Sequence, residues 1–335
     1  MADRRTDTER ALAASGAGVR ADEPLSRHTT FGIGGPAQYW VEVSSEAELA
    51  AVLAVVAVRR MRWWVLGRGS NVLISDQGLP GMVLRLSGEL ARIEVMVEQG
   101  EPQRYRANRV DAGGSKPVLL PADGVLHCGG GAGLDEVATA AEAAGLCGAE
   151  FLAGIPGTVG GGLRTNAGAF GRSLSDIVEE VRVMDSDGSS RLLTGAELNR
   201  GYRTSVVPEG VIAVRAKLDL VPGVPTPTGE VRSRRREKQP NLPSAGSFFK
   251  NPAGEPAGRL IERCGLKGRR VGAAEVSEKH ANFIVNTGGT RFADVYGLAQ
   301  VVKANVEEQT GILLEEEVQV LPGGEHGEVH SDRCN

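Results

Sequence analysis

Residues 154–171 read GIPGTVGGGLRTNAGAFG, a stretch in which glycine recurs over a greater length than a plain turn requires. Clustered glycine is typical of backbone that adopts positive φ angles or lies close to a ligand. A flat cofactor lying against this long glycine loop would explain its composition, whereas the alternative is a glycine-rich corner needed only for packing. Its candidate cofactor contacts are Gly154, Ile155, Pro156, Gly157, Thr158, Gly160, Gly161, Asn166 and Gly168.

A short glycine loop lies upstream, at residues 67–71, directly after a predicted strand. A nucleotide pyrophosphate needs several backbone N–H donors directed at one place, with no side chain in the way. The short glycine loop meets that need, although a tight turn stabilised by an asparagine is an equal alternative. Its candidate cofactor contacts are Gly67, Arg68, Gly69, Ser70 and Asn71.

Neither loop matches a known nucleotide-binding fingerprint. The Rossmann pattern GxGxxG fails at residues 32–37 and 129–134, and the P-loop pattern is absent. Predicted helices and strands follow one another irregularly, which indicates an α+β chain rather than a doubly wound sheet. The clearest predicted elements are helices at 45–60, 134–144 and 291–310, a hairpin turning at 187–188, and a final strand at 312–321.

The bulk composition limits the class of protein. The 335 residues suffice for two or three domains of roughly 100–200 residues each. A net charge of −4 argues against nucleic acid or an anionic membrane as the main partner, and no stretch approaches the roughly 20 apolar residues of a membrane span. The four cysteines lack CxxC or metal-ligand spacing, so we expect no metal site and free thiols in a reducing compartment.

Three further segments carry candidate chemistry. Ser247 could be a proton donor, a nucleophile or a structural serine, but a nucleophile needs a histidine base and no GxSxG elbow is present. The basic run 232–238 is either a solvated helix face or a clamp for a diphosphate, which Arg and Lys bind through charge-assisted hydrogen bonds. The run Glu315-Glu316-Glu317 is either a charged edge strand or the source of one carboxylate directed into a site.

Taken in order, six segments of the chain resemble the UDP-N-acetylenolpyruvoylglucosamine reductases, the MurB family. Six ordered segments are far more specific than any one of them, and the resemblance spans roughly residues 25–322. The segments are TTFGIGG (29–35), LGRGSNVL (66–73), the long glycine loop, GYRTS (201–205), AGSFFKNP (245–252) and LEEEV (314–318).

This resemblance implies an α+β fold with an FAD-binding region of the vanillyl-alcohol-oxidase/PCMH type in two subdomains, plus an α+β substrate-binding domain. A Pro- and Gly-rich linker at 221–230 separates the two regions. The predicted parts are a flexible N-terminal arm at 1–22, a first FAD-binding subdomain at 23–88 with a return strand at 311–321, a second at 89–222, the substrate-binding domain at 230–310 and a flexible tail at 322–335.

The resemblance also implies an activity. NADPH would reduce bound FAD, and the flavin would then reduce UDP-N-acetylglucosamine enolpyruvate to UDP-N-acetylmuramate for peptidoglycan synthesis. The expected partner is the UDP-sugar, without nucleic acid or membrane. The enzyme is expected in the cytoplasm, as a monomer or weak dimer.

By position, the resemblance assigns the reacting groups. Ser247 would protonate the enol at the carbon bearing the ether, while Arg203 and Glu317 would stabilise the enol intermediate. The family commonly has LEPEV at 314–318, so the choice of Glu317 depends on register. No extra tyrosine-bearing loop precedes the basic run, which indicates the subclass that lacks it. The candidate substrate contacts are Tyr202, Arg235, Lys238 and Asn251.

Two alternatives remain open on the sequence. An FAD-linked oxidase of a small hydroxy acid or alcohol would share the glycine loops but not the segment around Ser247. A non-catalytic protein that binds a UDP-sugar or flavin would not need all three candidate catalytic side chains.

Overall fold

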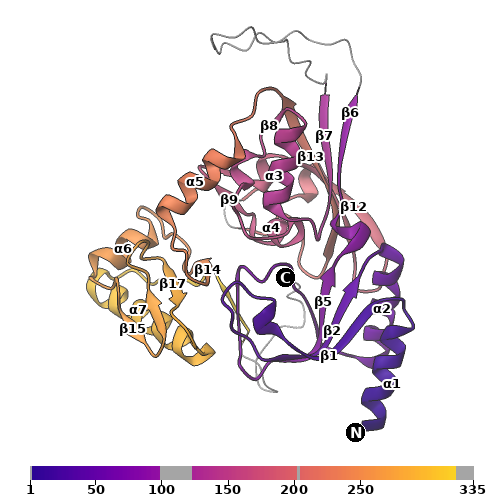
Figure 1. Cartoon of the computed structure of the whole chain (residues 1–335), viewed down its shortest axis with the longest axis horizontal. Coiled ribbons are helices and arrows are strands. Elements are labelled where there is room, and N and C mark those ends of the chain that lie inside the picture. Colours follow the sequence, from indigo (N-terminus) through magenta and orange to yellow (C-terminus); the bar gives the residue numbers. More distant parts are fainter. Residues whose placement is uncertain (1, 99–122, 202–203, 322–335) are drawn as a thin grey trace. The chain divides into compact units, whose positions relative to one another are not determined.

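The computed structural model describes residues 2–98, 123–201 and 204–321 (Figure 1). The predicted tail, most of the 91–123 segment, Tyr202 and Arg203 lie outside the described residues. The chain divides into two compact units. Unit 1 comprises Met1–Glu42, Arg59–Arg85 and Arg235–Arg333, and unit 2 comprises Val43–Val58, Leu86–Arg234 and Cys334–Asn335.

The N-terminal part of unit 1 is built on a sheet of strand order β1-β2-β5-β3. Strands β3 and β5 pair in parallel, and β1 pairs antiparallel with β2. A separate parallel pair joins β4 to β18, so the chain returns to this region near its end, over a much shorter strand than the predicted 311–321. The strands are β1 (Gly18–Pro24), β2 (Pro36–Val43), β3 (Trp63–Val65), β4 (Val72–Ile74), β5 (Leu79–Leu86) and β18 (Gln319–Leu321).

The prediction of a flexible N-terminal arm at residues 1–22 is wrong. Its residues form helix α1 (Ala2–Ala13) and strand β1. Leu12 is fully buried, and Arg5 forms an ion pair with Asp22. The sequence of α1 is strongly polar with few apolar residues, so its periodicity gave little sign of a helix that packs on one leucine.

The C-terminal part of unit 1 is a small sheet of order β14-β17-β16-β15 with two helices. Helix α7 (Phe292–Thr310) buries one face at helical spacing and ends at Gly311, whose φ of 71° suits glycine at this position. The sequence also suggested Thr290 as the N-cap of this helix, but the N-cap is Arg291, and the Thr290 hydroxyl donates to the Ala273 carbonyl instead. The other elements are β14 (Ser244–Ser247), α6 (Ala257–Arg263), β15 (Arg270–Val271), β16 (Ala274–Val276) and β17 (Phe283–Asn286).

Unit 2 is built on a larger sheet in which β12, β11, β13, β7 and β6 lie side by side in that order, and β8 also pairs with β13. All of these pairings are antiparallel. The predicted hairpin is confirmed, with Gly188 at φ 83° in its turn. The strands are β6 (Ile93–Glu98), β7 (Asp123–Gly129), β8 (Leu146–Cys147), β11 (Val178–Met184), β12 (Ser190–Thr194) and β13 (Ile212–Pro222).

Helices α3 (Leu134–Ala143) and α4 (Val159–Thr165) lie beside the strands of this sheet (Figure 1). These helices and strands share one hydrophobic core. Helix α3 ends before Gly145, as predicted. Helix α2 (Glu46–Arg59) also matches its prediction. The basic run is helical, within α5 (Thr228–Lys238), and the division between the two units falls inside this helix rather than at the predicted linker.

Two general properties of the described residues bear on the expected class. None of their helices is long and apolar enough to cross a membrane. Cys128, Cys147 and Cys264 are free thiols, as expected, and burial raises the pKa of Cys128 to about 12. Cys334 lies outside the described residues.

Candidate functional site

The glutamate run in unit 1 is paired with the segment that follows Ser247. The Glu317 N–H donates to the Phe248 carbonyl at 2.8 Å, and the Lys250 N–H donates to the Glu315 carbonyl at 2.9 Å. Phe249 and Glu316 form an antiparallel bridge between these two bonds. Glu317 is therefore held by the residue adjacent to Ser247, so the two candidate catalytic residues lie close together.

The three glutamates have different surroundings. Glu315 is exposed and its carboxylate pairs with Lys250 at 3.2 Å. Glu316 pairs with Lys303 of α7 at 2.8 Å. Glu317 is half-buried, and its Oε2 atom is shielded from solvent. The structure thus distinguishes the glutamate that has a buried carboxylate oxygen from the two that pair with lysines, which the local sequence could not do.

The short glycine loop reaches the same part of unit 1. The Asn71 side chain donates to the Glu317 carbonyl at 3.1 Å, and the Gln319 N–H donates to the Asn71 carbonyl at 2.9 Å. Thr30 joins the loop to the start of β14, because its N–H donates to the Gly69 carbonyl and its hydroxyl to the Ser244 carbonyl. Four of the six motif segments therefore meet within unit 1.

Position 69 in this loop requires glycine for steric reasons. Its φ is 60°, and a Cβ there would lie 2.2 Å from the His28 carbonyl oxygen. Close approach of two backbone segments explains this glycine without any ligand.

Ser247 lies at the end of β14, where Ser247 pairs with Phe283 of β17. The ladder is irregular between Ser244 and Ser247, and Gly246 has a φ of 79°. The Ser247 side chain is half-buried, and none of the residues that the structure describes makes a hydrogen bond to its hydroxyl. A fixed backbone with an unengaged hydroxyl suits a group that acts on a bound molecule.

The long glycine loop lies in unit 2 and contains the short helix α4. The Thr158 side chain accepts from the Gly161 N–H at its start. A Cβ at Gly162 would lie 2.6 Å from Leu174 Cδ1, and one at Gly168 would lie 2.3 Å from the Arg172 carbonyl oxygen, so packing explains these two glycines. At Gly161 a Cβ would meet only Thr158 Oγ1, at 3.4 Å, so packing within the described protein does not require glycine there.

Asn166, predicted as a cofactor contact, makes its side-chain hydrogen bonds to protein. It is buried with a φ of 47°, and its carbonyl oxygen accepts from the Ser175 N–H at 3.0 Å. Its amide donates to the Ser175 hydroxyl at 3.0 Å and to the Gly201 carbonyl at 2.9 Å. Asn166 therefore anchors Gly201, the residue that precedes Tyr202 and Arg203 in the chain, a role that no local sequence pattern indicates.

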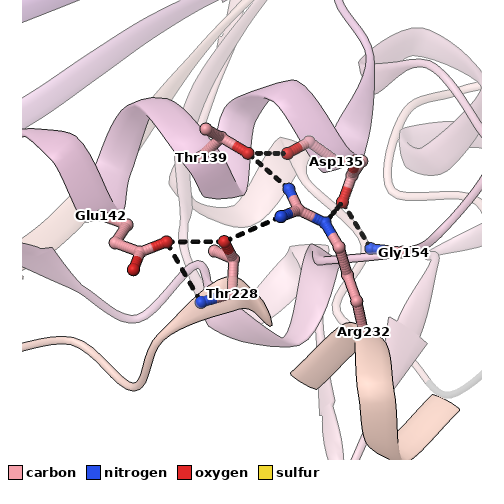
Figure 2. Close-up of polar contacts among 6 residues, drawn as sticks. All are labelled: Asp135, Thr139, Glu142, Gly154, Thr228 and Arg232. Carbon is pink, nitrogen blue, oxygen red and sulfur yellow. Dashed lines mark hydrogen bonds and ion pairs between the residues drawn. The ribbon is translucent and has the colours of Figure 1, made fainter. Parts of the chain in front are cut away.

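A second anchor holds the beginning of the long glycine loop (Figure 2). Asp135 of α3 accepts from the Gly154 N–H at 2.6 Å and from Arg232 Nε at 2.8 Å. Arg232 of α5 also donates to the hydroxyls of Thr139 and Thr228. Asp135 thus connects the loop to α5. Arg232 belongs to the basic run singled out in the sequence, but its pairing with Asp135 was not foreseen because the two residues are 97 positions apart.

The N-terminal end of α5, at Thr228, is held by a second carboxylate. Glu142 accepts from the Thr228 hydroxyl at 2.6 Å and from its N–H at 3.1 Å (Figure 2). The hydrogen bond from the Thr228 hydroxyl is the main cause that lowers the pKa of Glu142, and the bond from the Thr228 N–H adds to it. Both bonds favour the ionised carboxylate. The helix that carries the basic run is therefore fixed at its first turn.

Arg232→Ala is expected to lower the free energy of unfolding by about 1–2 kcal/mol, because it removes a partly exposed ion pair and two charge-assisted hydrogen bonds. Urea unfolding followed by circular dichroism measures this difference. Arg234→Ala is the control, because Arg234 is an exposed arginine on the same helix. Equal unfolding midpoints for the two variants would show that the Arg232 contacts contribute nothing.

The predicted substrate contacts described by the structure lie in unit 1. Arg235 is half-buried, and Lys238 is exposed at the last position of α5. The Asn251 side-chain oxygen accepts from the Ala257 N–H at 3.0 Å, so Asn251 also supports the start of α6. Two cationic side chains one helical turn apart can bind one diphosphate. Diphosphate binding by Arg235 and Lys238 stays a prediction.

Comparisons with known proteins agree with this arrangement. Residues 238–321 match the family model for the C-terminal domain of UDP-N-acetylenolpyruvoylglucosamine reductase, and residues 37–193 match the model for an FAD binding domain. UDP-N-acetylenolpyruvoylglucosamine reductase 2 of Symbiobacterium thermophilum is 42% identical, over 90% of this chain and 92% of its own length. The corresponding reductase of Agathobacter rectalis is 39% identical over 91% and 94%.

A solved structure has the same fold over nearly the whole chain. It is the UDP-N-acetylenolpyruvylglucosamine reductase (MurB) of Thermus caldophilus, which is 36% identical, with a TM-score of 0.70. The match covers 91% of this chain and 100% of the other. The shared fold therefore extends over most of the chain rather than over one isolated motif.

Proposed function

The chain belongs to the UDP-N-acetylenolpyruvoylglucosamine reductase family, and from that premise we propose that Ser247, Glu317 and Arg203 act on the substrate of this reaction. The activity is the FAD-dependent, NADPH-driven reduction of UDP-N-acetylglucosamine enolpyruvate to UDP-N-acetylmuramate in peptidoglycan synthesis. The observation that supports the residue assignment is the hydrogen bond from the Glu317 N–H to Phe248, next to Ser247.

The residues present fit FAD as the cofactor. Gly161 stands at the surface of the long glycine loop, where a Cβ would meet no atom closer than 3.4 Å, so its missing side chain leaves space that a flat ligand can use. Asp135 and Thr158 hold the loop in shape through hydrogen bonds to the Gly154 and Gly161 N–H groups. Bound FAD supplies the redox chemistry, hydride transfer from NADPH to the enolpyruvyl carbon.

Ser247 is the proposed proton donor. Hydride addition to the enolpyruvyl double bond leaves an enol whose carbon next to the carboxylate needs one proton. The Ser247 hydroxyl donates that proton, which completes addition of one hydride and one proton across the bond. A serine is a weak acid, so it serves here only because the accepting carbon is strongly basic.

Glu317 and Arg203 are the proposed stabilisers of the enol intermediate. Charge develops on the carboxylate-conjugated carbon, and preorganised polar groups directed at that charge lower the barrier. Glu317 suits the role better than its neighbours, since Glu315 and Glu316 form ion pairs with lysines and Glu317 has a buried oxygen. Arg203 is assigned from its position in the GYRTS segment.

The UDP part of the substrate is proposed to bind at α5 and the 251–257 turn. Arg235 and Lys238 supply positive charge for the diphosphate, and Asn251 and Tyr202 supply hydrogen bonds. Because the substrate and NADPH are cytoplasmic metabolites, we place the reaction in the cytoplasm. The proposed oligomeric state is a monomer or weak dimer, which analytical ultracentrifugation of the purified protein tests.

The function is tested by NADPH oxidation with and without UDP-N-acetylglucosamine enolpyruvate. The purified holoenzyme is expected to be yellow and to consume NADPH rapidly only when the substrate is present. Oxygen-dependent turnover without the UDP-sugar would instead favour an oxidase. Tight substrate binding without NADPH oxidation would favour a non-catalytic binding protein.

Gly161→Ala is expected to weaken FAD binding by about 10–100-fold, because a methyl group would enter space proposed for the cofactor at a steric cost of about 1–3 kcal/mol. The apoprotein should be as stable as before, since alanine is favoured over glycine within a helix by roughly 0.5–1 kcal/mol. Titration of apoprotein with FAD measures the binding constant.

Gly162→Ala is the matched control for that experiment. Its Cβ would collide with the buried side chain of Leu174, so this neighbouring substitution should reduce the stability of the apoprotein. Unchanged FAD affinity in a well-folded Gly161→Ala variant would remove this part of the loop from the cofactor site.

A further inference from the structure

The backbone that carries Ser247 leaves the regular sheet at that residue. Strand β14 ends at Ser247, and its ladder with β17 is irregular over the last residues. Phe248 and Phe249 follow, each only 1% exposed, so their backbone polar groups are shut away from water. Buried N–H and carbonyl groups need partners, and a neighbouring strand does not supply all of them here.

The Asn282 side chain supplies the missing partners on one side. Its Oδ1 atom accepts from the Phe249 N–H at 2.9 Å, and its Nδ2 atom donates to the Phe249 carbonyl at 2.8 Å. Its own backbone carbonyl accepts from the Phe248 N–H at 2.7 Å. One residue thereby imitates a short piece of paired strand, and it fixes both residues that follow Ser247.

The other edge of the same two residues holds Glu317. The Phe248 carbonyl accepts from the Glu317 N–H at 2.8 Å, and the bridge between Phe249 and Glu316 continues the pairing. The dipeptide Phe248-Phe249 therefore lies between Asn282 on one side and the glutamate run on the other. A displacement at Asn282 would shift Ser247 through the chain and Glu317 through its hydrogen bond.

Asn282 is itself held rigidly. It is only 3% exposed, and its N–H donates to His280 Nδ1 at 3.3 Å. The Ser277 hydroxyl accepts from the N–H groups of Lys279 and His280, which closes the turn before β17. The Asn282 amide cannot reorient without leaving buried polar groups unpaired, at a cost of about 1–3 kcal/mol.

We propose that Asn282 is a positioning residue for the reaction, which sets the placement of the Ser247 hydroxyl relative to the Glu317 carboxyl group. This inference rests on the proposed function of those two residues. Asn282 touches neither substrate nor cofactor in this scheme and acts through Phe248 and Phe249. Its effect falls on the step in which the substrate is reduced and protonated, and not on the reduction of FAD by NADPH.

Rapid-mixing kinetics of the holoenzyme separate these two steps. In Asn282→Ala the reduction of FAD by NADPH is expected to be unchanged, while reoxidation by UDP-N-acetylglucosamine enolpyruvate slows by about 10–100-fold, as misplacement of reacting groups by about 1 Å does. Should Asn282→Ala fail to fold, Asn282→Ser retains a small polar side chain and is measured in its place. Equal slowing of both steps would overturn the proposal.

Asn286→Ala is the matched control. Asn286 lies at the far end of β17, the strand that follows Asn282. Its side chain is also anchored to backbone, through the Phe31 carbonyl and the Gly288 N–H, but it forms no hydrogen bond with Phe248 or Phe249. Its loss should reduce thermal stability while leaving both steps at their original rates. Selective slowing of reoxidation in this control as well would mean that general loosening, rather than Asn282, causes the effect.

The double variant Ser247→Ala, Asn282→Ala distinguishes positioning from a plain structural role. If Asn282 acts by placing Ser247, the double variant should be reoxidised only slightly more slowly than Ser247→Ala. The effects of the two substitutions on the reoxidation rate are then not additive. Full additivity would contradict the proposal. Normal reoxidation in Ser247→Ala would instead defeat the proposed function of Ser247, whereas normal reoxidation only in Asn282→Ala would remove the role of Asn282.

Discussion

Ser247→Ala is expected to slow reoxidation of the reduced holoenzyme by UDP-N-acetylglucosamine enolpyruvate by about 10²–10⁴-fold, the range that a positioned proton donor contributes. Reduction of FAD by NADPH should be unchanged, because Ser247 acts only on the substrate. Stopped-flow absorbance of the flavin follows both steps in one sample.

Ser244→Ala provides the control for this substitution. Ser244 lies on the same strand, and its backbone carbonyl accepts from Thr30 while its side chain has no assigned role. Its variant should retain both rates. If Ser247→Ala reduced the substrate at the wild-type rate, protonation would have to be assigned to another group.

Glu317→Gln is expected to lower the same rate by about 10²–10³-fold, comparable to removing one preorganised polar group at a charged transition state. The substitution preserves shape and the backbone bond to Phe248 but removes the ionisable group. Substrate binding, measured by the concentration dependence of reoxidation, should change much less than the limiting rate.

The two neighbouring glutamates offer unusually close controls. Glu315→Gln removes only an exposed ion pair with Lys250, which contributes about 0–1 kcal/mol to stability. Glu316→Gln removes a less exposed ion pair with Lys303. It should lower the free energy of unfolding and leave the reoxidation rate unchanged. A large loss of rate in Glu316→Gln with none in Glu317→Gln would mean that the register of this run has been assigned wrongly.

The sequence predicted those helix ends and turns that depend on a single glycine. Gly145 and Gly311 ended α3 and α7 where expected, and Gly188 formed the hairpin turn. These positions require positive φ angles, and glycine adopts them without strain. Helix α1 was missed because its burial depends on one leucine rather than on a repeated apolar pattern.

The final strand shows why pattern reading fails in the site itself. The apolar run 312–321 predicted one long strand, yet only Gln319–Leu321 pairs with β4, while residues 315–318 bond to the chain after Ser247. Asn282 and Asp135 were missed for a related reason. Each has partners far away in sequence, and a single polar residue gives no periodic signal of where its amide or carboxylate will point.

The same long-range pairing has a consequence for how the protein is made. Asn71 and Glu317, which hydrogen bond in the finished structure, are 246 positions apart in the chain. Unit 2 is encoded almost entirely between the segments of unit 1, so it can complete its core while the ribosome is still working. The pairing of residues 248–250 with 315–318 can form only near the end of synthesis, since it waits for the last strand. We therefore expect the newborn chain to complete the sheet of unit 2 early, and to bring Ser247 and Glu317 together only at the final closure of a very long loop.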